Sequence, residues 1–157
     1  MGEDESLRQA VEAYGDMVYR LALAQTHSSH DADDVFQEVF LRYLRAAPVF
    51  REEEHRKAWL LRVTVNCCKK LHGSFWRRHM VALSEALPAQ NPEEGELLGL
   101  LEGLPQKYRA VLHLYYYEGY ATEEIAAILG RSPGTVRSQL SRGRALLRDA
   151  WKGAEEL

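Results

Sequence analysis

The chain has 157 residues, of which 46% are hydrophobic and 27% charged, a composition typical of a globular protein with one domain or two small ones. No apolar run approaches the ~20 residues of a membrane helix, and the acidic start MGEDESLRQ has no signal-peptide core, so we expect a cytoplasmic protein without membrane insertion. The net charge of −3 excludes a uniformly basic nucleic-acid binder, so any attraction to nucleic acid must be local.

Three amphipathic helices are predicted in the first half of the chain. Apolar residues at steps of three and four predict a first helix over residues 5–25. After a polar turn over residues 26–30, Ser29 or Asp31 caps a second helix, which ends near Ala46 because Pro48 cannot continue it. The apolar residues that indicate this second helix are Val35, Val39, Leu41 and Leu44.

A third helix is predicted from about Arg56 to Lys70 or beyond, after a loop over residues 49–55. The loop carries Phe50 and three consecutive glutamates, Glu52, Glu53 and Glu54. Because the loop follows Pro48, it cannot simply extend the second helix.

A linker and a second domain follow these helices. Residues 84–96 contain two prolines, an asparagine and a glycine among acidic side chains, which predicts a flexible linker. Leucines resume a helical pattern at residue 97, and Pro105 opens a further helix that Gly119 ends. No segment alternates with period two for long enough to be a strand. We therefore expect an all-α protein with two small helical domains, residues 1–83 and 97–157.

A helix-turn-helix motif is predicted near the C-terminus. Thr122 is the expected N-cap of a short helix that ends at Leu129, and Gly130 accepts the positive φ of a tight helix exit. Ser132 is a second N-cap, and Pro133 is the first residue of a longer helix. The apolar stripe of this longer helix comprises Val136, Leu140, Gly143 and Leu147. Glycine on the stripe predicts a close approach to a neighbouring helix.

The charge of this motif indicates binding to DNA. Residues 125–148 contain five arginines and no acidic residue. Several polar side chains lie off the apolar stripe of the second helix: Arg137, Ser138, Ser141, Arg142 and Arg144. Such a helix fits a major groove, where arginine contacts guanine edges and phosphates. The alternative is an amphipathic hairpin with a solvated basic face.

Charge is segregated along the rest of the chain as well. Residues 42–80 carry ten basic and three acidic side chains, whereas residues 1–41 carry two basic and nine acidic ones. Residues 81–102 carry five acidic side chains and no basic one, and residues 103–157 carry eight basic and six acidic ones. The two basic segments predict two places where nucleic acid is attracted, separated by acidic segments that repel it.

Three motifs in this order resemble the bacterial sigma-70-class transcription initiation factors, specifically the small extracytoplasmic-function (ECF) group. They are DADDVFQEVFLRYL (31–44), HRKAWLLRVTVNCCKK (55–70) and the region-4-like stretch over residues 104–148. The resemblance covers nearly the whole chain, with residues 1–83 similar to sigma region 2 and residues 97–157 similar to sigma region 4. It implies an RNA polymerase sigma factor that recognises −10 and −35 promoter elements and opens the DNA.

The resemblance also implies a polymerase-binding surface. Asp34, Gln37 and Glu38 match the family's contacts with the β′ clamp helices of core RNA polymerase, and the β flap is a second expected contact. Without the resemblance, a solvated acidic helix face would be the preferred interpretation of these residues. Family members are commonly held by an anti-sigma factor, so we expect such a partner here.

The resemblance further assigns DNA-binding residues. For the −10 element, Phe50 and Asn66 match family positions at the pocket for a displaced base. Four cationic residues are our candidates for contacts with the DNA backbone there: Lys69, Lys70, Arg77 and Arg78. For the −35 element, Arg137, Ser138 and Arg142 match recognition-helix positions. Ser141 is a further candidate contact, and Arg131 and Arg144 are expected on phosphates. A carboxylate among residues 52–54 could accept from cytosine N4, but we favour a solvated run. Trp59 is expected in the core and Trp76 in packing contacts.

No catalytic constellation is visible, so we do not expect an enzyme. The six histidines are scattered, no glycine-rich phosphate loop occurs, and the only cysteines, Cys67 and Cys68, are adjacent and too few for a zinc site. We expect no cofactor and no metal. Two other functions remain open: a helix-turn-helix regulator that binds DNA without polymerase, and a sigma-like interaction protein that cannot melt DNA.

Overall fold

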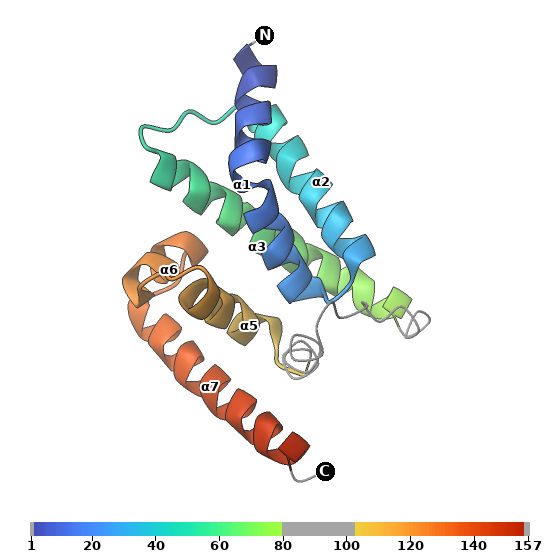
Figure 1. The fold of residues 1–157 in the computed structure, drawn as a ribbon, viewed down its shortest axis with the longest axis vertical. Coiled ribbons are helices and arrows are strands. Elements are labelled where there is room, and N and C mark those ends of the chain that lie inside the picture. The colour runs from blue at the N-terminus through green and yellow to red at the C-terminus, as the bar shows by residue number, and fades with distance from the viewer. Residues whose placement is uncertain (1, 80–102, 156–157) are drawn as a thin grey trace. The chain divides into compact units, whose positions relative to one another are not determined.

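A computed structural model describes residues 2–79 and 103–155, with side chains described for residues 5–71 and 103–153. Within these residues all regular elements are helices, as the sequence predicts (Figure 1). The chain forms two compact units, Met1–Ala86 and Leu87–Leu157. The predicted linker, residues 84–96, lies outside the described residues.

The described part of the first unit is a bundle of three helices. They are α1 (Gly2–Thr26), α2 (Ser29–Ala46) and α3 (Glu53–His79), and each packs against the other two (Figure 1). Its fully buried side chains include Val18, Leu21, Val35, Val39, Leu60 and Leu61.

Leu41 was expected among the apolar residues of α2, but its side chain is 43% exposed. Residue 41 is two positions beyond Val39, which is buried. At about 100° per residue, that rotation carries the Leu41 side chain away from the core.

The ends of α2 follow simple capping chemistry. Ser28, in an extended conformation, is the N-cap, and its hydroxyl accepts a hydrogen bond from the backbone N–H of Asp31 at 3.3 Å. The expectation of Ser29 or Asp31 as the cap is therefore wrong. At the other end Ala47 adopts a left-handed conformation with φ of 42°, directly before Pro48.

The described part of the second unit contains four helical segments. They are α5 (Gln106–Leu112), the π-helix η1 (His113–Tyr117), α6 (Thr122–Leu129) and α7 (Pro133–Glu155). Buried side chains from all four form its core: Tyr108, Val111, Leu114, Ile125, Val136 and Leu140. A single helix was expected between Pro105 and Gly119, but its last part widens into the π-helix.

The helix-turn-helix forms largely as predicted. Gly119 and Gly130 have φ of 76° and 67°, a conformation that glycine adopts without the strain of a side chain. Ser132 caps α7, since its hydroxyl accepts from the Thr135 N–H at 3.1 Å.

The predicted cap of α6 is wrong by one residue. Ala121 occupies the N-cap position, and Thr122 is the first residue of the helix. The Ala121 N–H donates a hydrogen bond to the Glu124 carboxylate at 3.0 Å. The Glu124 carboxylate, inside the first turn, thus accepts a hydrogen bond from a backbone N–H at the helix start, whereas a hydroxyl was expected as the cap.

Helix α7 packs closely on α5 at Gly143. A Cβ atom at Gly143 would lie 3.2 Å from Leu112 Cδ1 and 3.3 Å from Tyr108 Cβ, closer than ordinary van der Waals contact. The predicted close approach is therefore confirmed. The neighbours on the stripe, Val136 and Leu140, are buried as well.

Gly143→Val should lower the free energy of unfolding of the second unit by about 1–3 kcal/mol, because the added side chain overpacks the α5–α7 contact. Gly153→Ala is the matched control, since a Cβ at Gly153 meets nothing within 4 Å. The control should be neutral or stabilising by up to ~1 kcal/mol. Urea denaturation followed by circular dichroism measures both, and equal stability of the two variants would contradict this account.

Candidate nucleic-acid interface

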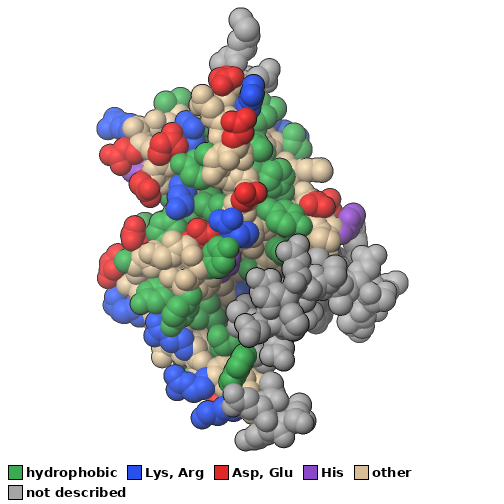
Figure 2. All heavy atoms as spheres, viewed as in Figure 1, with side chains coloured by type: hydrophobic (Ala, Val, Ile, Leu, Met, Phe, Trp, Pro, Cys, Tyr) green, Lys and Arg blue, Asp and Glu red, His purple; other side chains and the backbone are tan. Residues whose placement is uncertain are grey.

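The exposed face of α7 carries most of the residues predicted to contact the −35 element. Arg137, Ser138, Ser141 and Arg142 are exposed. On the opposite side, Val136, Leu140 and Gly143 of the predicted stripe are buried, and Leu147 is partly buried. Figure 2 shows Lys and Arg side chains gathered along the outer edge of α7. Within the described residues Arg137 and Arg142 form no ion pair, so their charges are available to a ligand.

Arg131, in the turn of the motif, lies in a different environment from the exposed arginines. Its Nη1 donates a hydrogen bond to Gln139 Oε1 at 2.7 Å, and its side chain is partly buried. Desolvation by burial lowers the pKa of Arg131 from its ordinary value. Arg131 therefore forms a hydrogen bond to a residue of α7. The phosphate contact expected for Arg131 stays a prediction.

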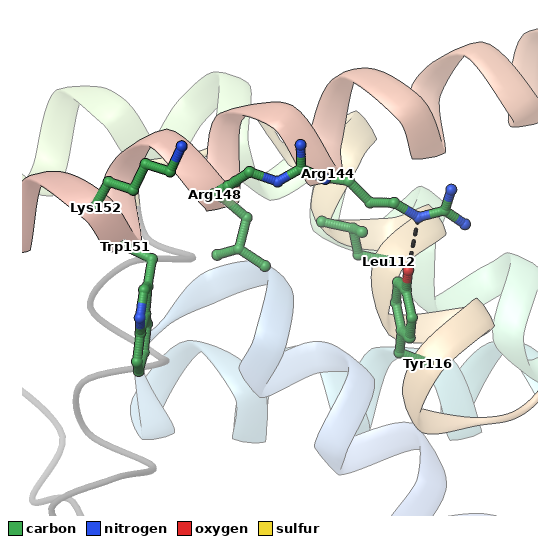
Figure 3. Close-up of a pocket in the computed structure, with 7 residues that line it drawn as sticks. Leu112, Tyr116, Arg144, Arg148, Trp151 and Lys152 are labelled. Atoms are coloured by element: carbon green, nitrogen blue, oxygen red, sulfur yellow. Dashed lines mark hydrogen bonds between the residues drawn. The ribbon is translucent and has the colours of Figure 1, made fainter.

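Arg144 is also held by the protein. Its Nε donates to the Tyr116 hydroxyl at 2.6 Å, and its guanidinium lies 5.4 Å from the Tyr115 ring centroid and 5.6 Å from that of Tyr116. Figure 3 shows Arg144 reaching from α7 to the Tyr116 hydroxyl. This pair borders an apolar groove of about 430 Å³, which Leu112 and Trp151 also line.

Aromatic side chains fix the loop before α3. The Phe50 ring packs edge-on against Trp59 at 6.2 Å between centroids, and Trp59 packs edge-on against Tyr43 at 5.8 Å. The Arg56 guanidinium lies 5.9 Å from the Phe50 centroid. Phe50 remains partly exposed, so it combines a fixed position with access from solvent. Trp59 is only partly buried and lies at the edge of the core.

Glu53 connects this loop to α1. Its Oε2 accepts a hydrogen bond from the Tyr14 hydroxyl at 2.8 Å, and its Oε1 lies 3.5 Å from Arg56 Nη1. Burial and then the hydrogen bond to Glu53 raise the pKa of Tyr14 to about 12. The three glutamates are exposed, as expected of a solvated run, but Glu53 also ties the start of α3 to α1. No signal in the sequence links residues 14 and 53, which are far apart in the chain.

The remaining predicted −10 residues lie along α3. Asn66, Lys69 and Lys70 are exposed. Asn66 follows Trp59 by seven residues, close to two helical turns, so both lie on one face of the helix. Arg77 and Arg78 belong to the last turns of α3, and their side chains, like that of Trp76, lie outside the described residues.

The predicted polymerase-binding residues share one side of α2. Asp34 and Gln37 are exposed, and Glu38 is partly exposed. Arg42 Nε lies 3.0 Å from Glu38 Oε1, and this hydrogen bond raises the pKa of Arg42. The exposed Leu41 follows Gln37 by about one turn. The face thus offers carboxylates beside an apolar side chain, which suits a protein partner.

The described residues contain no group of three or more His, Cys, Asp or Glu side chains able to hold a metal ion. Among the same residues, no helix is long and apolar enough to cross a membrane. Cys67 and Cys68 are buried on α3 and form no disulfide within the described residues. Burial raises the pKa of Cys67, which disfavours the reactive thiolate.

Comparison with known proteins gives consistent matches over both units. A profile described as Sigma-70 region 2 matches residues 10–79, and one described as Sigma-70, region 4 matches residues 94–147. The chain is 38% identical to ECF RNA polymerase sigma factor SigE of Mycolicibacterium smegmatis, over 93% of this chain and 60% of that protein. It is 32% identical to the ECF RNA polymerase sigma-E factor of Escherichia coli K12, over 74% of this chain and 71% of that protein.

Two solved structures share the fold. CnrH, in complex with the cytosolic domain of CnrY, is 25% identical with a TM-score of 0.74, covering 96% of this chain and 90% of CnrH. RpoE from Bartonella quintana, in complex with the anti-sigma factor NepR, is 22% identical with the same TM-score, covering 94% and 98%. The chain spans 60% of the length of M. smegmatis SigE and 41% of the probable sigma factor RfaY of Xanthomonas campestris.

Burial of the Tyr14 hydroxyl, together with its hydrogen bond to Glu53, predicts a specific pH dependence. The pKa of Tyr14 is raised from 10.0 to about 12 on folding, so the protonated hydroxyl stabilises the native state below pH 10. This contribution should be lost as the pH rises from 10 through 12. The tyrosinate absorbance of wild type minus Tyr14→Phe should therefore titrate near pH 12.

Glu53→Gln should move that titration toward lower pH, because the neutral amide no longer repels the tyrosinate that forms beside it. Glu52→Gln is the matched control, since Glu52 makes no contact with Tyr14 among the described residues, and it should leave the titration in place. A difference titration already centred at pH 10 in the wild type would contradict the Tyr14–Glu53 hydrogen bond.

Proposed function

The chain belongs to the ECF group of the sigma-70 family, and we propose that it is a promoter-specificity subunit that binds core RNA polymerase and directs transcription initiation. Residues 1–83 recognise and open the −10 element, residues 97–157 bind the −35 element, and residues 84–96 link them. The observation that carries the proposal is the exposed basic face of α7 in a helix-turn-helix, where Arg137 and Arg142 form no ion pair with any described residue.

Recognition of the −35 element follows from the geometry of α7. The buried stripe holds one side of the helix against the second unit and leaves Arg137, Ser138 and Arg142 facing outward. A major groove about 12 Å wide admits such a helix, and arginine forms bidentate hydrogen bonds to guanine O6 and N7. Serine hydroxyls, including that of the exposed Ser141, contact either bases or phosphates. Arg131 and Arg144 support this face through contacts with Gln139 and Tyr116.

Opening of the −10 element draws its energy from binding. Separation of the strands loses base stacking, which captured bases and new phosphate contacts must replace. Phe50, fixed by Trp59 and Arg56 yet partly exposed, lines the pocket for a displaced base. Asn66 contacts that base from α3. The backbone of the separated strand is attracted by four cationic side chains: Lys69, Lys70, Arg77 and Arg78.

The partners follow from the same surfaces. Asp34, Gln37 and Glu38 on α2 bind the β′ clamp helices of core polymerase, with the exposed Leu41 beside them, and the β flap is a second contact. Two structural relatives are complexes with NepR and CnrY, the first named an anti-sigma factor, which supports an anti-sigma partner here. A protein with these partners acts in the cytoplasm and is not an enzyme.

Replacement of the recognition-helix arginines should weaken promoter binding. Arg137→Ala and Arg142→Ala should each weaken binding of the polymerase complex to its promoter by about 1–3 kcal/mol, because each removes a base or phosphate contact. Transcript starts mapped after overexpression supply the promoter. Arg148→Ala is the control, since Arg148 is exposed further along α7. Equal promoter binding by all three variants would rule out −35 recognition by this face.

Substitutions at the residues proposed for DNA opening should have different effects from substitutions at the residues proposed to bind polymerase. Phe50→Ala with Asn66→Ala should reduce promoter opening at least tenfold, a loss of about 1.4 kcal/mol, while binding to core polymerase persists. Permanganate footprinting measures opening, and gel filtration with core polymerase measures binding. Asp34→Ala with Glu38→Ala should instead reduce binding to core polymerase. A wild-type protein that binds DNA but never associates with core polymerase would favour a plain helix-turn-helix regulator.

A further inference from the structure

A polar recess lies between α5 and the N-terminal half of α7. Its volume is about 320 Å³, and its polar lining side chains are Lys107, Thr135, Ser138, Gln139 and Arg142. Lys107 comes from α5, outside the helix-turn-helix, and the other four come from α7. No carboxylate is among the described residues that line it. Two cationic side chains from different helices therefore line one recess, and no described carboxylate lines it with them.

The hydrogen-bonding groups of the recess are arranged for an anion. Gln139 Oε1 already accepts from Arg131 Nη1 at 2.7 Å, so the Gln139 amide offers its NH₂ as a donor to any further ligand. Lys107 Nζ lies 5.0 Å from the Tyr108 ring centroid, and neither Lys107 nor Arg142 forms an ion pair within the described residues. The hydroxyl of Ser138 adds a further donor. The recess thus presents two positive charges and neutral donors.

The position of the recess identifies the anion. Ser138 and Arg142 line the recess and also belong to the exposed face of α7 that the proposed function places in the major groove. Backbone phosphates border a major groove on both sides of an inserted helix. A phosphate beside α7 would meet Lys107 from α5, although Lys107 lies outside the motif that reads the bases.

We propose that this recess is a binding site for a DNA backbone phosphate, with Lys107 and Arg142 as its cationic ligands and Gln139 as a neutral donor. Arg131 is a positioning residue, which orients the Gln139 amide toward the phosphate. The proposal rests on the proposed function and adds a contact from α5 that fixes the register of α7 on the duplex. Lys107 lies within the region-4-like stretch over residues 104–148, but on a different helix from the recognition residues, so no local pattern in the sequence joins it to them.

The test measures binding of the full chain to short DNA duplexes of two unrelated sequences over a range of KCl concentrations. A phosphate contact is independent of base sequence, so Lys107→Gln should weaken both complexes by the same factor. The loss should be about eightfold at about 0.1 M salt, and the slope of log affinity against log salt should become shallower by about 0.9. Lys152→Gln, which removes an exposed cation far along α7, is the matched control and should leave the slope unchanged.

A second set of variants tests the orientation of Gln139. Gln139→Glu keeps an acceptor for Arg131 but places a negative charge in the recess, so it should weaken binding to both duplexes more than Gln139→Ala does. Arg131→Met should weaken binding of the protein that carries Gln139, but should have little further effect on Gln139→Ala. Circular dichroism of each variant confirms that the helices remain folded. Equal affinities of folded Gln139→Glu and Gln139→Ala would show that no anion occupies the recess.

The outcomes separate this site from the proposed function. If Lys107→Gln leaves affinity and salt slope unchanged while Arg137→Ala weakens DNA binding, the recess is not a phosphate site and the DNA-binding function stands. If Lys107→Gln and Lys152→Gln reduced affinity and salt slope equally, the loss would come from net charge alone, and this outcome would also overturn the proposed phosphate site. If the wild-type chain bound neither duplex even at low salt, the phosphate site would be overturned, whereas the proposed function, which promoter binding by the polymerase complex tests, would stand.

Discussion

The packing of α7 on α5 at Gly143 is the constraint on which the second unit depends. A Cβ placed on this glycine would lie only 3.2–3.3 Å from atoms of Leu112 and Tyr108, so the two helices meet where α7 has no side chain. This contact fixes the rotation of α7 about its own axis, and the rest of the buried stripe follows from it. The opposite side, with Arg137 and Arg142, must then face solvent. A helix of the same sequence packed in another rotation would bury charge, at a cost that no partner in the core offsets.

The arginines of the motif divide into two groups with different physical roles. Arg137 and Arg142 are exposed and make no ion pair among the described residues, so they keep their full charge for a ligand. Arg131 and Arg144 instead donate to side chains of the second unit and hold them in place. Surface contacts of this kind contribute little to stability, but they fix the direction of the groups that they join. A basic sequence segment therefore contains both exposed cations, unpaired among the described residues, and cations that hydrogen-bond within the unit.

In the first unit, aromatic and carboxylate side chains hold the loop before α3 in place. Phe50 lies in the loop between α2 and α3, where an isolated side chain would have many conformations. Its contacts with Trp59 and Arg56, together with the contacts of Glu53 to Arg56 and Tyr14, restrict that freedom in the unbound protein. A ring that is already ordered loses less entropy when it binds a base. On α7, likewise, Arg131 orients Gln139 through a hydrogen bond within the second unit.

The sequence by itself determined the helices, their approximate ends, the glycines at the sharp turns and the buried stripe of α7, because these depend on local periodicity and backbone preference. It misplaced the caps of α2 and α6. Ser28 accepts from the Asp31 N–H, and the Glu124 carboxylate accepts from the Ala121 N–H; only the folded geometry decides which polar side chain near a helix start forms such a bond. Only the tertiary structure decided that Glu53 meets Tyr14 and that Lys107 joins Arg142 at one recess. These contacts join different helices, and their partners depend on how the helices pack, which no local pattern encodes.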